Sequence, residues 1–235
     1  MLEAEKKYYI NKVLCASDPD DPRHFLNYRF RHVFLVFGFT GSGKDTVINT
    51  FLKENKEHPF VKFVRTMTRD QRPDELEMTD GFFVEKKLFD TLKKNHRFFY
   101  DYERYNGTQF GYDAMHFIFQ LVHRNIIMAG GGEANFEGLI EGIHNIIDMI
   151  PVTTIFINRP KEDIIASLKK RGGDPAQIQG RIDNINAQWY EKPKKQVDHF
   201  ILNTDLKASV AEFVRIIDAT LATKIGEEDQ LMPRS

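Results

Sequence analysis

The segment most suited to chemistry is a glycine-rich run that leads into a lysine, Gly38-Phe39-Thr40-Gly41-Ser42-Gly43-Lys44-Asp45-Thr46. It follows the apolar residues 33–37 and precedes apolar positions with helical spacing, so it joins a predicted buried strand to a predicted helix. Glycines in such a turn let backbone N–H groups converge on phosphate oxygens, and the helix N-terminus adds partial positive charge. The lysine can reach the β and γ phosphates. The pattern therefore predicts a P-loop for a nucleoside triphosphate, whereas an ordinary strand–helix turn would not need all of these features.

One position departs from the usual P-loop pattern, in which a Ser or Thr follows the lysine and its hydroxyl group holds Mg²⁺. Here Asp45 follows Lys44, and Thr46 comes next. A carboxylate beside phosphates is repelled unless a cation lies between them. We therefore expect Mg²⁺ near Asp45 and Thr46, held partly through water.

Composition narrows the class of protein. The chain has 235 residues, 41% of them hydrophobic, and a formal net charge of −1, so it can bury a sizeable core and offers no bulk basic field for nucleic acid. Its single cysteine, Cys15, excludes an intramolecular disulfide. We find no signal-peptide pattern and no long apolar stretch, and therefore expect a cytoplasmic protein with no membrane partner. We expect a monomer or a homodimer.

Strands and helices alternate along the rest of the chain. Strands are predicted at about 60–65, 81–84, 125–129, 152–157 and 197–202, and helices at about 86–95, 112–123, 134–147, 160–171, 174–192 and 206–222. Residues 97–111 are predicted to be aromatic and turn-like. Near-continuous apolar strands separated by helices predict an α/β fold with a parallel sheet flanked by helices.

A second candidate site for phosphate contains Arg65, Arg69 and Arg72, three arginines within eight residues after a predicted strand. Arginine suits phosphate because its planar group binds two oxygens at once. The aromatic and acidic stretch 100–112 could stack on a base and accept its hydrogen bonds. Arg65 can be interpreted as an additional phosphate ligand or as a partner of Asp70 or Asp101, and the sequence leaves both readings open.

The order and spacing of three segments resemble guanylate kinases. These segments are Thr66-Met67-Thr68-Arg69-Asp70-Gln71-Arg72-Pro73, then Asp80-Gly81-Phe82-Phe83-Val84, then Asn106-Gly107-Thr108-Gln109-Phe110-Gly111. The resemblance covers about residues 32–223. It implies a P-loop NTPase fold with an acceptor-binding insertion at about 65–112 and a helical lid at about 159–182. We expect the guanylate kinase-like domain to span 31–223, with an N-terminal extension at 1–30 before it and a C-terminal tail at 224–235 after it.

The resemblance also implies roles for individual residues. ATP is the implied co-substrate, bound by Gly41, Ser42, Gly43, Lys44, Asp45, Thr46 and Asn203. Arg69 and Arg72 are implied to hold the acceptor's phosphate. The implied catalytic residues are Lys44 and two lid arginines, Arg171 and Arg181, which would balance charge on the transferring group.

The residues that read the acceptor's base depart from the family pattern. Arg65 stands where a serine is expected, Asp101 where a glutamate is expected, and Phe110 where a phosphate-binding tyrosine is expected, while Tyr112 takes a position for a small hydroxyl residue. GMP is the acceptor that the family implies. Arg65 and the Gly43-Lys44-Asp45 run also resemble ribose 1,5-bisphosphate phosphokinase. A third possibility is a non-catalytic binding module of the same fold, although the P-loop lysine and glycines are present here.

Overall fold

The computed structural model describes residues 31–56, 59–73, 75–104, 106–130, 136–148, 150–171, 175–188 and 197–231. The contacts divide the chain into two compact units. The first, called here the P-loop unit, lies within Phe34–His58, Ala129–Gly132 and Thr153–Ser235. The second, called here the aromatic unit, lies within Met1–Val33, Pro59–Met128 and Glu133–Val152. The predicted N-terminal extension falls outside the described residues.

A five-stranded sheet has the strand order β2-β7-β1-β8-β9. Its strands are β1 (Val33–Phe37), β2 (Phe60–Phe63), β7 (Asn125–Ala129), β8 (Val152–Asn158) and β9 (His199–Leu202). β2 pairs with β7, and β8 with β9, in the parallel sense. β1 and β7 are buried along their whole length, which explains why their residues are almost all apolar. The predicted parallel α/β sheet is confirmed.

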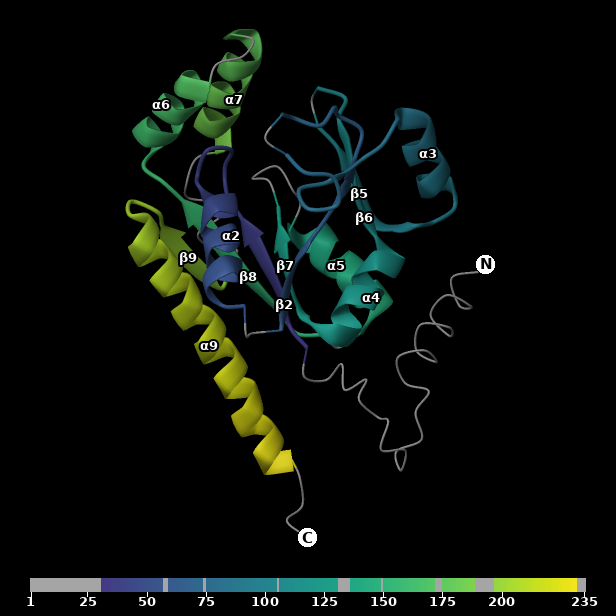
Figure 1. Cartoon of the computed structure of the whole chain (residues 1–235), viewed down its shortest axis with the longest axis vertical. Coiled ribbons are helices and arrows are strands. Elements are labelled where there is room, and N and C mark those ends of the chain that lie inside the picture. Colours follow the sequence, from purple (N-terminus) through teal and green to yellow (C-terminus); the bar gives the residue numbers. More distant parts are fainter. Residues whose placement is uncertain are drawn as a thin grey trace. The chain divides into compact units, whose positions relative to one another are not determined.

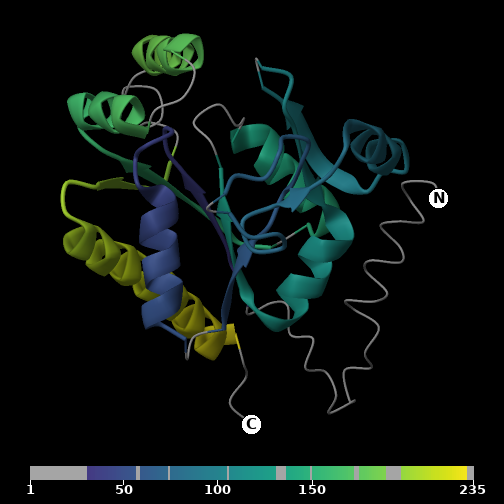
Figure 2. The same ribbon diagram turned by 45° about the horizontal axis from the view of Figure 1, so that its top comes forward.

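The helices of the P-loop unit are α2 (Lys44–Glu54), α6 (Lys161–Arg171), α7 (Pro175–Gln188) and α9 (Leu206–Leu231). In Figures 1 and 2, α2 and α9 run side by side, and the rings of Phe51 and Phe213 meet edge to face at 5.3 Å between their centroids. α9 continues to Leu231, so its predicted end near residue 222 is wrong. No helix of the described chain is long and apolar enough to cross a membrane.

The aromatic unit contains a four-stranded sheet with the order β4-β3-β6-β5. Its strands are β3 (Thr66–Met67), β4 (Phe82–Phe83), β5 (Phe98–Glu103) and β6 (Gln109–Asp113). The prediction that 97–111 is turn-like is wrong, because β5 and β6 form an antiparallel hairpin. Its turn includes Gly107, whose φ of 76° suits glycine. Aromatic residues favour strands, so this stretch has a strand composition on both sides of the turn.

Aromatic rings fill the core of this unit, between the sheet and the helices α3 (Lys86–Lys94), α4 (Ala114–His123) and α5 (Phe136–Ile146). The rings of Phe63 and Tyr112 stack with an interplanar angle of 8°. Gly142 lets α5 approach β5 closely, because a Cβ atom there would lie 2.7 Å from the backbone oxygen of Phe99. The core therefore fixes β5 and β6, which carry several of the predicted acceptor residues.

Candidate active site

The P-loop backbone has the shape that the sequence predicts. Gly41 and Gly43 have φ angles of 90° and 83°, which non-glycine residues rarely adopt, and Gly43 is the N-cap of α2. Gly38 is required by a close approach instead, since a Cβ atom there would lie 2.2 Å from the carbonyl oxygen of Ile157. The strand, turn and helix are thus confirmed, and the N-terminal N–H groups of α2 form a site suited to anions.

Ser42 lies inside this turn and is fully buried. Its N–H donates to the carbonyl of Phe39 at 3.0 Å, which closes the turn. Its Oγ is buried without a hydrogen-bond partner among the described residues. An unpaired buried hydroxyl is uncommon in native proteins, and at the start of a helix it suits a site that receives a polar ligand.

Asn203, predicted to bind ATP, supports the P-loop from behind. Its Nδ2 donates to the backbone oxygen of Ser42 at 2.8 Å, and its Oδ1 accepts from the hydroxyl of Ser209 at 3.0 Å. All three residues are buried. Asn203 therefore supports the backbone of the loop, and its predicted role in binding ATP stays a prediction.

Asn203→Ala is expected to destabilise the P-loop unit by about 1–3 kcal/mol, because the buried Ser42 carbonyl loses its donor. The KM for ATP should rise with it. Chemical denaturation and initial rates test this, with Thr204→Ala at the exposed neighbouring position as the control. A loss of discrimination between ATP and GTP without loss of stability would instead indicate that Asn203 contacts the base.

Lys44 begins α2, and its Nζ lies 3.0 Å from Oδ2 of Asp45. The Lys44 side chain is 13% exposed, whereas that of Asp45 is 55% exposed. The sequence argument assumed that repulsion between Asp45 and the ATP phosphates requires a metal ion between them. The ammonium group of Lys44 already provides a positive charge beside this carboxylate, so that repulsion alone does not require a metal. The Asp45 carboxylate is exposed enough to be reached by a metal ion or by water bound to one.

The predicted metal ligands fit the chemistry of Mg²⁺ in nucleotide sites. Asp45 and Thr46 supply a carboxylate and a hydroxyl group, and both residues are exposed at the start of α2. Within the described ranges, no three His, Cys, Asp or Glu residues form a cluster able to hold a metal. Such a site suits Mg²⁺, which keeps several waters and binds one or two protein groups together with phosphate oxygens.

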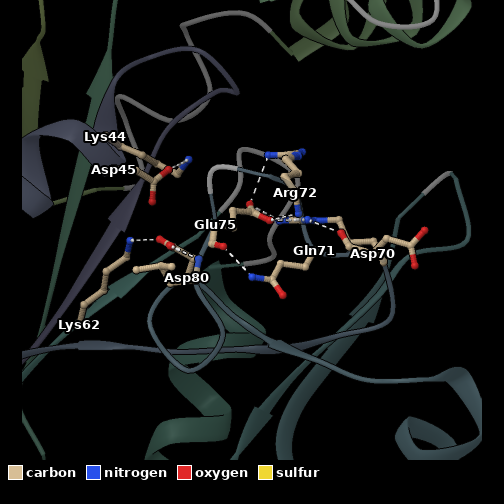
Figure 3. A network of polar contacts seen from close by, with 10 residues as sticks. Lys44, Asp45, Lys62, Asp70, Gln71, Arg72, Glu75 and Asp80 are labelled. Carbon is tan, nitrogen blue, oxygen red and sulfur yellow. Dashed lines mark hydrogen bonds and ion pairs between the residues drawn. The ribbon is translucent and has the colours of Figure 1, made fainter.

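Two of the predicted acceptor arginines, Arg69 and Arg72, lie in the loop between β3 and β4, and Figure 3 shows Arg72 beside Glu75 of the same loop. Arg69 binds its carboxylate with two hydrogen bonds, Nη1 to Oε2 at 2.7 Å and Nη2 to Oε1 at 2.5 Å. The backbone N–H of Arg72 donates to Oε2 at 3.0 Å, and Nη1 of Arg72 lies 3.5 Å from Oε1. The structure thus brings Arg69 and Arg72 together around one carboxylate.

The arginines of this loop keep Glu75 negatively charged. Partial burial raises the pKa of Glu75, but the hydrogen bonds from Arg69 and from the Arg72 backbone outweigh burial and hold that pKa below its usual range. The carboxylate is therefore ionised at neutral pH. Arg69 also lies over the ring of Phe83 at 5.2 Å, so contacts on two sides orient its guanidinium group.

Arg65 lies among aromatic rings. Its Nη1 donates to the hydroxyl of Tyr102 at 3.1 Å, and its guanidinium carbon lies 5.2 Å from the ring centre of Phe110 and 6.0 Å from that of Tyr112. Phe110 and Tyr112 are buried, and the Tyr112 hydroxyl group has no hydrogen-bond partner within the described structure. Burial raises the pKa of Tyr112 despite the nearby Arg65. These two residues therefore support Arg65 from the core.

Asp101, the predicted reader of the acceptor's base, lies on β5 and forms an ion pair with Lys93 of α3. Gly111 lies opposite it on β6, and the ring of Phe98 covers that glycine. Asp101 thus has a charged partner, Lys93, that sequence inspection did not reveal.

The chain matches the guanylate kinase family over residues 30–220. This chain belongs to the guanylate kinase family. It is 25% identical to a guanylate kinase of Mycoplasmoides gallisepticum over 79% of this chain and 91% of that protein. It is 29% identical to a guanylate kinase of Wolinella succinogenes over 82% of this chain and 86% of that protein. The crystal structure of guanylate kinase from Anaplasma phagocytophilum has the same fold, with a TM-score of 0.59, 20% sequence identity, and coverage of 81% of this chain and 86% of that one.

The guanylate kinase resemblance predicted two lid arginines, which the structure places on neighbouring helices. Arg171 is the last residue of α6, and Arg181 lies within α7. Residues 172–174, between the helices, and the two side chains fall outside the described part of the chain. Their predicted roles rest on the sequence.

Glu75 is the residue that sequence reasoning missed in this guanylate kinase relative. A usable signal was present, because Arg69, Arg72 and Glu75 follow one another at intervals of three residues. An acid close to two arginines in a loop is able to pair with both. Phosphate ligands are expected to be positively charged, so the acidic Glu75 was not predicted as part of the site.

Proposed function

We propose that this member of the guanylate kinase family transfers the γ-phosphate of ATP to GMP, giving ADP and GDP. One observation carries the proposal: a chain matched to the family over residues 30–220 has both the P-loop that ends in Lys44 and the paired arginines Arg69 and Arg72. The first suits a triphosphate donor and the second a phosphate acceptor. We propose the cytoplasm as the place of the reaction.

Phosphoryl transfer depends on positioning and on neutralising charge. In this proposal, the backbone of residues 41–46 and Lys44 hold the ATP phosphates, and Arg69 and Arg72 hold the phosphate of GMP. Mg²⁺ near Asp45 and Thr46 would neutralise charge between the β and γ phosphates. An anionic phosphate acceptor needs no general base, in contrast to a hydroxyl acceptor.

The lid, about 159–182, would add Arg171 and Arg181 to the transferring group and exclude water. The insertion, about 65–112, would hold the acceptor, with Asp101 directed to its base. Asp101 can accept hydrogen bonds from the N–H groups of guanine. Arg65 contacts Tyr102, the next residue of β5, and therefore lies on the opposite face of the hairpin from Asp101.

The contacts of Arg65 bear on the sugar bisphosphate alternative. That alternative treated Arg65 as a ligand for an additional phosphate. Arg65 already contacts Tyr102, Phe110 and Tyr112, so its position in the aromatic unit does not require a second phosphate on the acceptor. The intact P-loop geometry, with all three glycines in functional positions, argues against a non-catalytic module.

The proposal is tested by measuring ADP release from Mg-ATP with GMP, dGMP, AMP, UMP and ribose 1,5-bisphosphate in parallel. We expect turnover with GMP to exceed that with the other ribonucleotides and the sugar bisphosphate by at least about a hundredfold, because a site built for hydrogen bonds rejects acceptors that lack them. EDTA in excess should abolish it. Turnover with ribose 1,5-bisphosphate and none of the nucleotides would overturn the proposal. So would a protein that binds ATP but shows no turnover with any of the five acceptors.

A further inference from the structure

We infer that Glu75 is a positioning residue for the acceptor's phosphate, and that it orients Arg69 so that a defined edge of the guanidinium group meets that phosphate. The inference rests on the proposed function. It adds to that function a fixed negative charge inside the phosphate-binding loop, where only positive charge was expected.

Counting the donors of Arg69 gives the orientation. A guanidinium group has five N–H bonds: two on each Nη and one on Nε. The two Nη1 bonds are taken by Oε2 of Glu75 and by the backbone oxygen of Asp70 at 2.8 Å, and one Nη2 bond by Oε1 of Glu75. The remaining pair, Nε–H and the second Nη2–H, has no hydrogen-bond acceptor within the described ranges. These two bonds lie along one edge and match two oxygens of a phosphate.

Glu75 is held in place by its own loop. Its backbone N–H donates to the carbonyl of Arg72 at 3.1 Å, and its carbonyl accepts from Nε2 of Gln71 at 2.6 Å (Figure 3). The carboxylate is 14% exposed and has four contacts with Arg69 and Arg72. A group anchored at both backbone and side chain is a fixed part of the site, so a phosphate would bind beside it.

The alternative role for Glu75 is that of a competitor, with the carboxylate occupying the place of the phosphate and leaving when the acceptor binds. The two roles predict opposite effects when its charge is removed. A competitor that is lost lowers the KM for GMP, because the arginines become available. A positioning group that is lost raises this KM, because Arg69 takes many orientations.

Glu75→Gln tests the difference, because an amide keeps the size of the side chain but presents an N–H group to the arginine fork. We expect the KM for GMP to rise about tenfold, within the usual range of coupling in one hydrogen-bond network, with the KM for ATP unchanged. Glu75→Asp keeps the charge and should recover part of the loss. The control is Glu77→Gln, which removes the same charge from the same loop, where Glu77 accepts from the Phe83 backbone N–H at 3.3 and 3.4 Å and makes no contact with Arg69 or Arg72 that the described residues show.

Thermal unfolding of each variant and calorimetric titration with GMP separate the possible results. A selective rise in the KM and Kd for GMP in Glu75→Gln, absent from Glu77→Gln, supports the inference. Equal behaviour of the two variants, a fall in the KM for GMP, or parallel changes in both KM values would overturn it. If the wild-type protein itself neither binds nor phosphorylates GMP, the proposed function fails, and the inference fails with it.

Discussion

Lys44→Ala is expected to lower kcat by roughly 10²–10³-fold, with the fold intact, because removal of one electrostatic group from a transition state has effects of this size. Lys44 is the first residue of α2, where alanine is a good helix former, so the backbone of the P-loop should persist. The variant also removes the cation that lies 3.0 Å from Asp45. Initial rates with saturating Mg-ATP and GMP measure the effect.

The matched control for this variant is Lys53→Ala, an exposed lysine in the last turn of the same helix. It removes the same charge from the same element and should leave kcat within about twofold of the wild type, as expected for an exposed surface site. Circular dichroism and thermal unfolding of both variants confirm folding. Retained turnover in Lys44→Ala would show that the P-loop lysine does not serve the ATP phosphates.

Arg69→Ala is expected to raise the KM for GMP by roughly 10–100-fold while the KM for ATP changes little. A hydrogen-bonded contact to a charged group contributes about 1.5–3 kcal/mol, which corresponds to a factor of this size. The variant removes both the proposed phosphate edge and the two-bond partner of Glu75. Full saturation curves for each substrate, with the other in excess, give the two KM values.

Arg69→Lys separates charge from shape, since lysine keeps the positive charge but lacks the planar fork. We expect it to recover only a small part of the affinity for GMP. Arg124→Ala, which removes an exposed arginine after α4, is the control for lost positive charge in the same unit. Equal increases in the KM for GMP and for ATP would place Arg69 outside the acceptor site.

The parts of the fold that sequence predicted well are those with a strong local signal. Mainly apolar runs predicted β1, β7 and β8, and the glycines of the P-loop predicted the start of α2. The hairpin of β5 and β6 was missed because residues 97–111 were predicted to be turn-like and their aromatic residues were interpreted as a ligand surface. That error was avoidable, since strand residues on both sides of such a turn are typical of a hairpin.

The candidate site was predictable as a set of residue types but not as a set of contacts. Lys44, Arg69 and Arg72 have spacings that indicate phosphate binding, and sequence inspection found them. The contact of Asn203 with Ser42 spans 161 positions, and no local pattern reveals such a pair. A side chain's partner depends on the packed fold, so the sequence did not reveal that Asn203 supports the loop, and its predicted role in binding ATP stays a prediction.

In the loop between β3 and β4, the carboxylate of Glu75 is less exposed than two apolar neighbours. Glu75 is 14% exposed, whereas Leu76 and Met78 are 65% and 68% exposed. Most side-chain hydrogen bonds of this loop join residues no more than six positions apart, and one exception is Thr68, whose hydroxyl group accepts from the backbone N–H of Gln109. The polar contacts of the loop are therefore mostly local, with a further contact from Asp80 to Lys62. Substitutions at its exposed apolar positions are expected to change the stability of the fold by no more than about 0.5 kcal/mol, so this surface can vary while the fold persists.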